Sequence, residues 1–210
     1  MLYISQTLRK EDKLRKELYM ATIRVNNDLE DFSVDLCVNE GRPTITIKDY
    51  SGNSENVVVP ESIGGFTVVD GVLFDKAMTT RIHIPQSLIG RTYSLSSCSA
   101  LTDITVSEHN PEYSGIDGVL FNKGGTTLLR YPKGRENKDY VVPDGVTLIG
   151  GSAFDNCERL GAVTLPMGLQ YIGEGAFDGC KNLETVTLSR KARMMYKALK
   201  GFSGKLVYRD

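Results

Sequence analysis

Apolar residues recur at every second position in short stretches along most of the chain. An alternation with a period of two is typical of a β-strand that buries one face. A proline follows most of these stretches, at a point where the strand no longer has to donate a hydrogen bond to its neighbour. The pattern predicts short strands whose inward positions are Val57/Val59, Ile82/Ile84, Ile104/Val106, Leu129/Tyr131, Tyr140/Val142, Val163/Leu165 and Val186/Leu188.

The strands belong to a repeat. Residues 141–163 and 164–186 align without gaps and are identical at ten of 23 positions. A second similarity, at a shift of 47 residues, relates residues 70–80 to 117–127, with eight of eleven positions identical. Weaker copies fill the gaps, so that repeats cover roughly residues 45 to 209. Self-similarity at such a period indicates a solenoid, in which stacked units share one core.

The segment that returns from each strand also has a pattern. Ile149, Ala153, Cys157 and Leu160 are spaced as on one face of a helix, which predicts one short helical turn per unit. Phe154 and the equivalent Phe177 should stack on each other as an aromatic spine inside the solenoid.

At these residues the chain resembles the Treponema-type, or BspA-like, leucine-rich repeats. Residues 160–183, LGAVTLPMGLQYIGEGAFDGCKNL, meet the pattern of that family almost position for position, and residues 110–146 resemble its connecting unit. The resemblance implies a curved, right-handed solenoid with strands on one face. It also implies a bacterial surface or secreted protein that binds host proteins, matrix proteins or other bacteria.

The ends of a solenoid need caps, because terminal units expose a core face and a strand edge. Residues 31–53 are expected to form a β-hairpin that closes the N-terminal end. The predicted fold is therefore an α/β leucine-rich-repeat solenoid over residues 31–210, rich in strands, with short helical turns. Residues 1–30 are expected to form a separate helical extension, with the helix over residues 5–19; it is either solvated or a docking helix. Met20 is an alternative start.

Charge and hydropathy narrow the function classes. The chain has 25 basic and 26 acidic residues, a net charge of −1, which favours neither nucleic acid nor an anionic membrane as a partner. No stretch approaches eighteen apolar residues, and the N-terminus lacks the apolar core of a signal peptide. As written, the sequence predicts a cytoplasmic location, whereas the family resemblance favours the cell surface.

The residues that could carry chemistry do not form a recognisable catalytic or metal-binding motif. Cys98, Cys157 and Cys180 occupy equivalent positions and are expected to be buried thiols rather than a disulfide or a metal site. Cys37 is expected to be buried in the hairpin cap. His83 and His109 are not near a nucleophile motif, and the repeated glycines lack the Lys-Ser/Thr of a phosphate loop. We expect no cofactor, no metal and no enzymatic activity.

What remains is the surface that the strands present. The row of outward side chains on the strands predicts a face that binds a protein or glycan partner, possibly in adhesion; an intracellular scaffold is the alternative. The predicted face consists of Arg81, His83, Asp103, Thr105, Leu128, Arg130, Asp139, Val141, Ala162, Thr164, Thr185 and Thr187.

Overall fold

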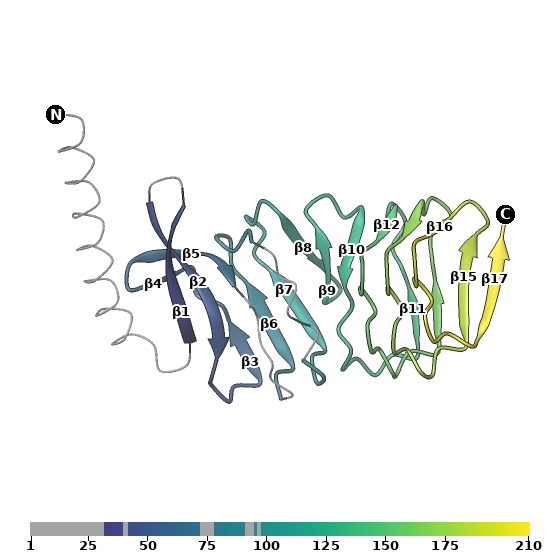
Figure 1. The fold of residues 1–210 in the computed structure, drawn as a ribbon, viewed down its shortest axis with the longest axis horizontal. Coiled ribbons are helices and arrows are strands. Elements are labelled where there is room, and N and C mark those ends of the chain that lie inside the picture. The colour runs from purple at the N-terminus through teal and green to yellow at the C-terminus, as the bar shows by residue number, and fades with distance from the viewer. Residues whose placement is uncertain (1–31, 40–41, 72–77, 91–94, 96–97) are drawn as a thin grey trace.

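The computed structural model describes residues 32–39, 42–71, 78–90, 95 and 98–210. These residues form strands joined by turns, with essentially no helix, and build a β-solenoid of about 7 turns. The turns, called rungs below, stack along one long axis (Figure 1). The helical extension predicted for residues 1–30 lies outside the described residues.

One side of the C-terminal rungs carries a parallel sheet, which we call the C-terminal strand row. Its strands pair in register at the repeat period, so that Val163 lies opposite Val186 and Val186 lies opposite Leu206. This register confirms the 23-residue unit read from the sequence. The row consists of β11 (Asp139–Val141), β13 (Ala162–Thr164), β15 (Thr185–Ser189) and β17 (Lys205–Arg209).

A second sheet, the return sheet, is formed by the segments that come back from these strands. Its four rung strands are parallel, and two antiparallel strands extend one edge. The rung strands are β10 (Thr127–Arg130), β12 (Leu148–Ile149), β14 (Tyr171–Ile172) and β16 (Arg193–Met194). The added hairpin is β8 (Tyr113–Ile116) and β9 (Val119–Asn122).

The N-terminal part contains the predicted hairpin and a shorter strand row. The hairpin strands β1 (Phe32–Asn39) and β2 (Arg42–Tyr50) are antiparallel, and β2 continues the stack by pairing in parallel with β5 (Phe66–Gly71). The short strand β4 (Ser62–Ile63) pairs with β5. The N-terminal strand row consists of β3 (Asn56–Val58), β6 (Arg81–Ile84) and β7 (Asp103–Val106).

An aromatic column runs through the core of the C-terminal rungs. The rings of Phe154 and Phe177 are stacked, with centroids 4.8 Å apart and an interplanar angle of 5°. Tyr131 takes the same position one rung earlier, with its ring centroid 5.3 Å from that of Phe154. The predicted spine is confirmed and is one residue longer than expected.

The predicted helical turns are wrong, although their inward residues are buried as expected. Ile149, Ala153, Cys157 and Leu160 are all at most 1% exposed. Ser152 and Asn156 have a φ of 55°, which an α-helix does not allow. The backbone N–H groups of this segment donate to the next rung instead, as from Phe154 to Ala176 O at 2.8 Å. Hydrogen bonds between rungs therefore replace those within a helix.

The hairpin β8–β9 interrupts the stack of strand rows. Its turn at Asp117 and Gly118 has positive φ angles of 47° and 73°, and Gly118 O accepts a hydrogen bond from the backbone N–H of Ile104 at 3.0 Å. The turn thus lies against β7, where a further strand of the row would otherwise pair. The described strands consequently form two separate rows rather than one continuous row.

Candidate ligand-binding surface

The N-terminal strand row brings four of the predicted face residues together. Arg81 on β6 lies opposite Asp103 on β7, and His83 lies opposite Thr105. His83 Nδ1 is 3.0 Å from Thr105 Oγ1, a hydrogen bond that fixes the orientation of the imidazole ring. None of these four side chains is buried. They form one small patch in which basic, acidic and hydroxyl groups are interspersed.

The C-terminal strand row carries a second patch of predicted residues. Asp139, Ala162 and Thr185 lie opposite one another on successive strands, as do Val141, Thr164 and Thr187. Asp139 and Val141 are exposed, Val141 by 68%, and the other four side chains are partly exposed. The patch is a shallow surface of short side chains with one carboxylate at its edge.

Two predicted face residues are in the wrong place. Leu128 is fully buried and Arg130 is only 7% exposed, because β10 belongs to the return sheet and not to a strand row. The backbone N–H of Tyr131 donates to Ala153 O, just as that of Phe154 donates to Ala176 O. Arg130 therefore takes the inward position that alanine holds in later rungs. The inserted hairpin shifts the phase of the chain, so Leu128 and not Leu129 points fully inward.

The Arg130 guanidinium has an internal role. It donates a hydrogen bond to the backbone carbonyl of Ser152 at 2.6 Å, which ties one rung to the next. Burial lowers the pKa of Arg130 from its ordinary value, since removal from water disfavours the charged form. Burial likewise raises the pKa of the neighbouring Tyr131 to about 12. Both groups belong to the core and are removed from the candidate surface.

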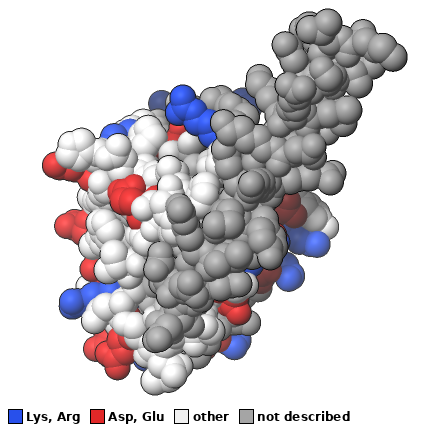
Figure 2. Space-filling view, turned by 90° about the vertical axis from the view of Figure 1, so that its left-hand side faces the viewer, with Lys and Arg blue, Asp and Glu red and all other residues white. Residues whose placement is uncertain are grey.

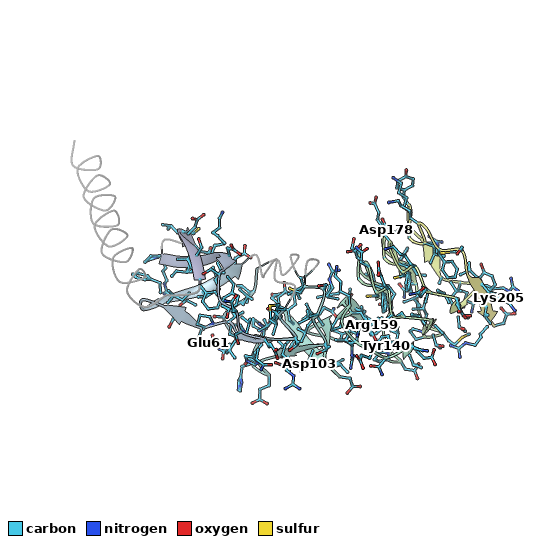
Figure 3. The ribbon with its side chains drawn as sticks, turned by 90° about the horizontal axis from the view of Figure 1, so that it is seen from below. Glu61, Asp103, Tyr140, Arg159, Asp178 and Lys205 are labelled. Atoms are coloured by element: carbon cyan, nitrogen blue, oxygen red, sulfur yellow. The ribbon has the colours of Figure 1, made fainter. Side chains whose placement is uncertain are left out.

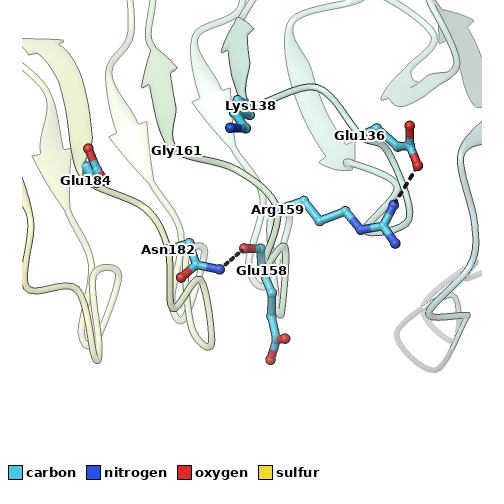
Figure 4. Close-up of a pocket in the computed structure, with 7 residues that line it drawn as sticks. All are labelled: Glu136, Lys138, Glu158, Arg159, Gly161, Asn182 and Glu184. Carbon is cyan, nitrogen blue, oxygen red and sulfur yellow. Dashed lines mark hydrogen bonds and ion pairs between the residues drawn. The ribbon is translucent and has the colours of Figure 1, made fainter.

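A groove of about 640 Å³ runs beside the C-terminal strand row, along the residues that precede its strands (Figure 4). Gly161, between Lys138 and Glu184 along the stack, has no side chain and leaves the groove open. The sequence argument allowed for flanking loops but named none of these residues. The signal that could have found them is the 23-residue alignment, which places charged residues in equivalent positions. The lining consists of Glu136, Lys138, Glu158, Arg159, Gly161, Asn182 and Glu184.

Ion pairs between rungs hold the walls of this groove. Arg159 pairs with Glu136 at 3.3 Å and also donates to Gly134 O at 3.2 Å. Lys181 pairs with Glu158, and this hydrogen bond lowers the pKa of the Glu158 carboxyl. Equivalent side chains alternate in sign from one rung to the next, so neighbouring rungs attract each other. The groove is a polar surface of mixed charge.

Mixed charge is also visible elsewhere. Viewed from the N-terminal end, acidic and basic side chains of the described residues are interspersed (Figure 2). The stack is curved rather than straight, and the turn of Asp178 lies on the side opposite the strand of Tyr140 (Figure 3). Strand rows and return turns are therefore separate surfaces.

The side chains with reactive groups are dispersed. Among the described residues, no three His, Cys, Asp or Glu side chains come together as metal ligands would. His109 is exposed and lies 3.6 Å from its neighbour Glu108, far along the chain from His83. No helix in the described part of the chain is long and apolar enough to cross a membrane.

Three of the four cysteines are buried, as the repeat predicts, and Cys37 is not. Cys180 Sγ donates to Phe154 O at 2.9 Å, and its hydrogen bond with Cys157, together with burial, raises the pKa of the Cys157 thiol. Cys37 is exposed on β1, where its Sγ is 3.6 Å from Thr46 Oγ1. The prediction for Cys37 is wrong because β2, through Ile45 and Ile47, supplies the buried face of the hairpin.

Taken together, the stacked rungs and paired strand rows define a β-solenoid of the leucine-rich-repeat type. The sequence model described as the BspA type leucine rich repeat region (6 copies) matches residues 131–200. The resemblance noted from the sequence is thereby confirmed, and over these residues the chain consists of BspA-type leucine-rich repeats. This family and fold are generally non-enzymatic binding modules, and no catalytic family is indicated.

Solved structures of bacterial leucine-rich-repeat proteins are similar to the chain. A leucine-rich repeat protein from Eubacterium ventriosum is 22% identical, with a TM-score of 0.53 over 70% of this chain and 45% of that chain. A leucine rich cell surface protein from Faecalibacterium prausnitzii is 26% identical, with a TM-score of 0.46 over 68% and 50% of the two chains. The chain thus spans about half the length of these relatives. At these identities the likeness concerns the fold. No curated protein matches the chain.

Proposed function

We propose that this protein is a non-enzymatic binding module that recognises a protein or glycan through the C-terminal strand row and the groove beside it. The observation that carries the proposal is the adjacency of the two features. Lys138, Gly161 and Glu184 line the groove and directly precede the first residues of β11, β13 and β15. A ligand lying across the strand row would therefore reach the groove without a gap.

The chemistry of this surface favours binding over catalysis. Its short side chains, Thr164, Thr187 and Val141, let a partner approach the sheet closely, and the rigid stack holds them without rearrangement. Lys138 and Glu184 provide opposite charges two rungs apart, roughly 10 Å given the spacing of strands. A ligand with complementary charges at that separation would be fixed in one orientation.

Adhesion at the bacterial surface is the biological role that we favour, because BspA-type repeats over residues 131–200 resemble surface proteins of this kind. The alternative is an intracellular scaffold, which the four free cysteines would also suit. Fractionation of cells, followed by protease treatment of intact cells, separates the two. Cleavage of the protein on intact cells supports adhesion, and protection supports the scaffold.

The binding surface is tested by filling the groove. The chain is screened against immobilised extracellular matrix proteins and a glycan array, and hits are measured again with Gly161→Trp. A side chain at Gly161 meets only Lys138 O, at 3.5 Å, so the variant should fold while its indole occupies the groove. Gly168→Trp is the matched control, since nothing lies within 4 Å of its Cβ position.

We expect Gly161→Trp to lower the affinity for a true ligand at least tenfold and Gly168→Trp to leave it unchanged. A second pair of variants, Val141→Glu and Arg81→Glu, distinguishes the two strand rows. Unchanged binding by both Gly161→Trp and Val141→Glu would contradict the assignment of the surface, and a failure of every matrix protein and glycan to bind would contradict the proposed function.

A further inference from the structure

The last rung has a charge composition unlike that of the rest of the chain. Residues 185–209 contain seven of the 25 basic residues and none of the 26 acidic residues, which leaves 18 basic and 26 acidic residues elsewhere. Only two of the seven form ion pairs among the described residues: Arg190 with Asp210 at 3.3 Å and Lys200 with Asp178 at 2.9 Å. A net charge of −1 therefore conceals a strongly basic end.

Exposed aromatic and methionine side chains gather at the same end. Arg193 on β16 lies opposite Tyr171 on β14 in the return sheet. Tyr196 is 70% exposed, and Lys197 Nζ lies 4.6 Å from the centre of its ring. Met195 is also exposed, between Arg193 and Tyr196. We call Tyr171, Arg193, Met195, Tyr196 and Lys197 the basic aromatic patch.

The construction of a rung does not require these side chains. The position of Arg193 is held by Leu148 in an earlier rung, and the parallel register carries Tyr196 onto Glu174 and Gly151. Small, acidic and apolar residues all satisfy the same backbone hydrogen bonds. Glu174 is exposed beside the patch and lines a shallow groove with Lys197 and Lys200, so it moderates the charge of the patch without cancelling it.

We infer that the basic aromatic patch docks a protein partner through an acidic surface that carries apolar side chains at its centre. Tyr, Met and Arg are the residue types enriched in the cores of protein interfaces, and Tyr and Arg are frequent among the residues that contribute most binding energy. The unpaired cations would steer an acidic partner and fix its orientation. This surface is on the return side of the solenoid, so the inference does not depend on the strand rows.

Charge also argues against other occupants. A two-fold contact between copies would place Arg193 and Lys197 of one chain near the same residues of the other, and like charges repel. Nucleic acid and sulfated glycan would use the cations, but their affinity would come mainly from charge and would fall steeply with salt. The exposed methionine and tyrosines distinguish a protein ligand from these polyanions.

The test uses the full chain and defined probes. Binding of a glutamate–tyrosine copolymer is compared with that of poly-glutamate, heparin and duplex DNA. The charge variant Arg193→Glu/Lys197→Glu and the apolar variant Met195→Ser/Tyr196→Ser alter exposed residues, and circular dichroism verifies their folding. Lys123→Glu, a charge reversal on the β8–β9 hairpin, is the matched control.

We expect the copolymer to bind most tightly, the charge variant to weaken it at least tenfold, and the apolar variant to weaken it at least threefold. Lys123→Glu should leave the affinity unchanged. Absence of saturable copolymer binding would overturn the inference. It would also be overturned by equal binding of heparin or DNA without an effect of the apolar variant, or by light scattering that shows patch-dependent self-association. Gly161→Trp should have no effect, which separates this result from the test of the strand row.

Discussion

The aromatic spine gives the sharpest prediction about stability. Phe177 is 1% exposed, and its ring is stacked on Phe154 at 4.8 Å. Burial of a phenylalanine side chain contributes about 1.5–3 kcal/mol, and a stacked aromatic pair adds about 0.5–1.5 kcal/mol. Phe177→Ala loses both and leaves a cavity, so we expect the free energy of unfolding to fall by about 3–5 kcal/mol.

Urea unfolding followed by far-UV circular dichroism measures this loss. Tyr196→Ala, at an exposed position of the next rung, is the control, with an expected change within about 0.5 kcal/mol. Phe154→Ala should cost as much as Phe177→Ala, and the double variant should cost less than their sum, because either single change already abolishes the stack. A loss below about 1 kcal/mol for Phe177→Ala, or full additivity, would refute a stacked spine that supports the rungs.

Three further predictions concern the core and the hairpin cap. In native protein, Cys37 should react with iodoacetamide while Cys98, Cys157 and Cys180 react only in urea; mass spectrometry would reveal the opposite order if the burial were wrong. Asn110→Ala should cost roughly 2–4 kcal/mol in urea unfolding, because the buried amide bonds Pro85 O, Leu88 O and two backbone N–H groups; a negligible change would argue against this role. Arg130→Glu should reduce the melting temperature, whereas the exposed Arg81→Glu should not, and equal effects would contradict the placement of Arg130 in the core.

Much of the fold could be predicted from the sequence, because a repeat states the same structural constraint several times. The recurrence of Val163 and Val186 after 23 residues predicted strands in register, and the recurrence of Phe154 and Phe177 predicted the stacked rings. A residue that faces the core in one rung must face it in the next, since the rungs share one interior. The hairpin over residues 31–53 followed from the need to cover the end of the stack.

The tertiary structure decided what periodicity leaves ambiguous. The spacing of Ile149, Ala153 and Cys157 fits a helix, but the same side chains can be buried by a chain of turns whose backbone hydrogen bonds go to the neighbouring rung. Local spacing does not distinguish the two cases, because the competing partners are 22 or 23 residues away in the sequence. The positive φ angles of Ser152 and Asn156 follow from those contacts.

The candidate surface depended on the inserted hairpin in the same way. Alternation placed Arg130 outward, yet the β8–β9 hairpin moves β10 into the return sheet, where Arg130 bonds Ser152 O in the core. The period of two identifies which residues share a face of a strand, and only the packing of the neighbouring strands determines which face is covered. The sequence by itself determined the repeat and most of its buried column, while the side on which each strand lies was decided by the tertiary fold.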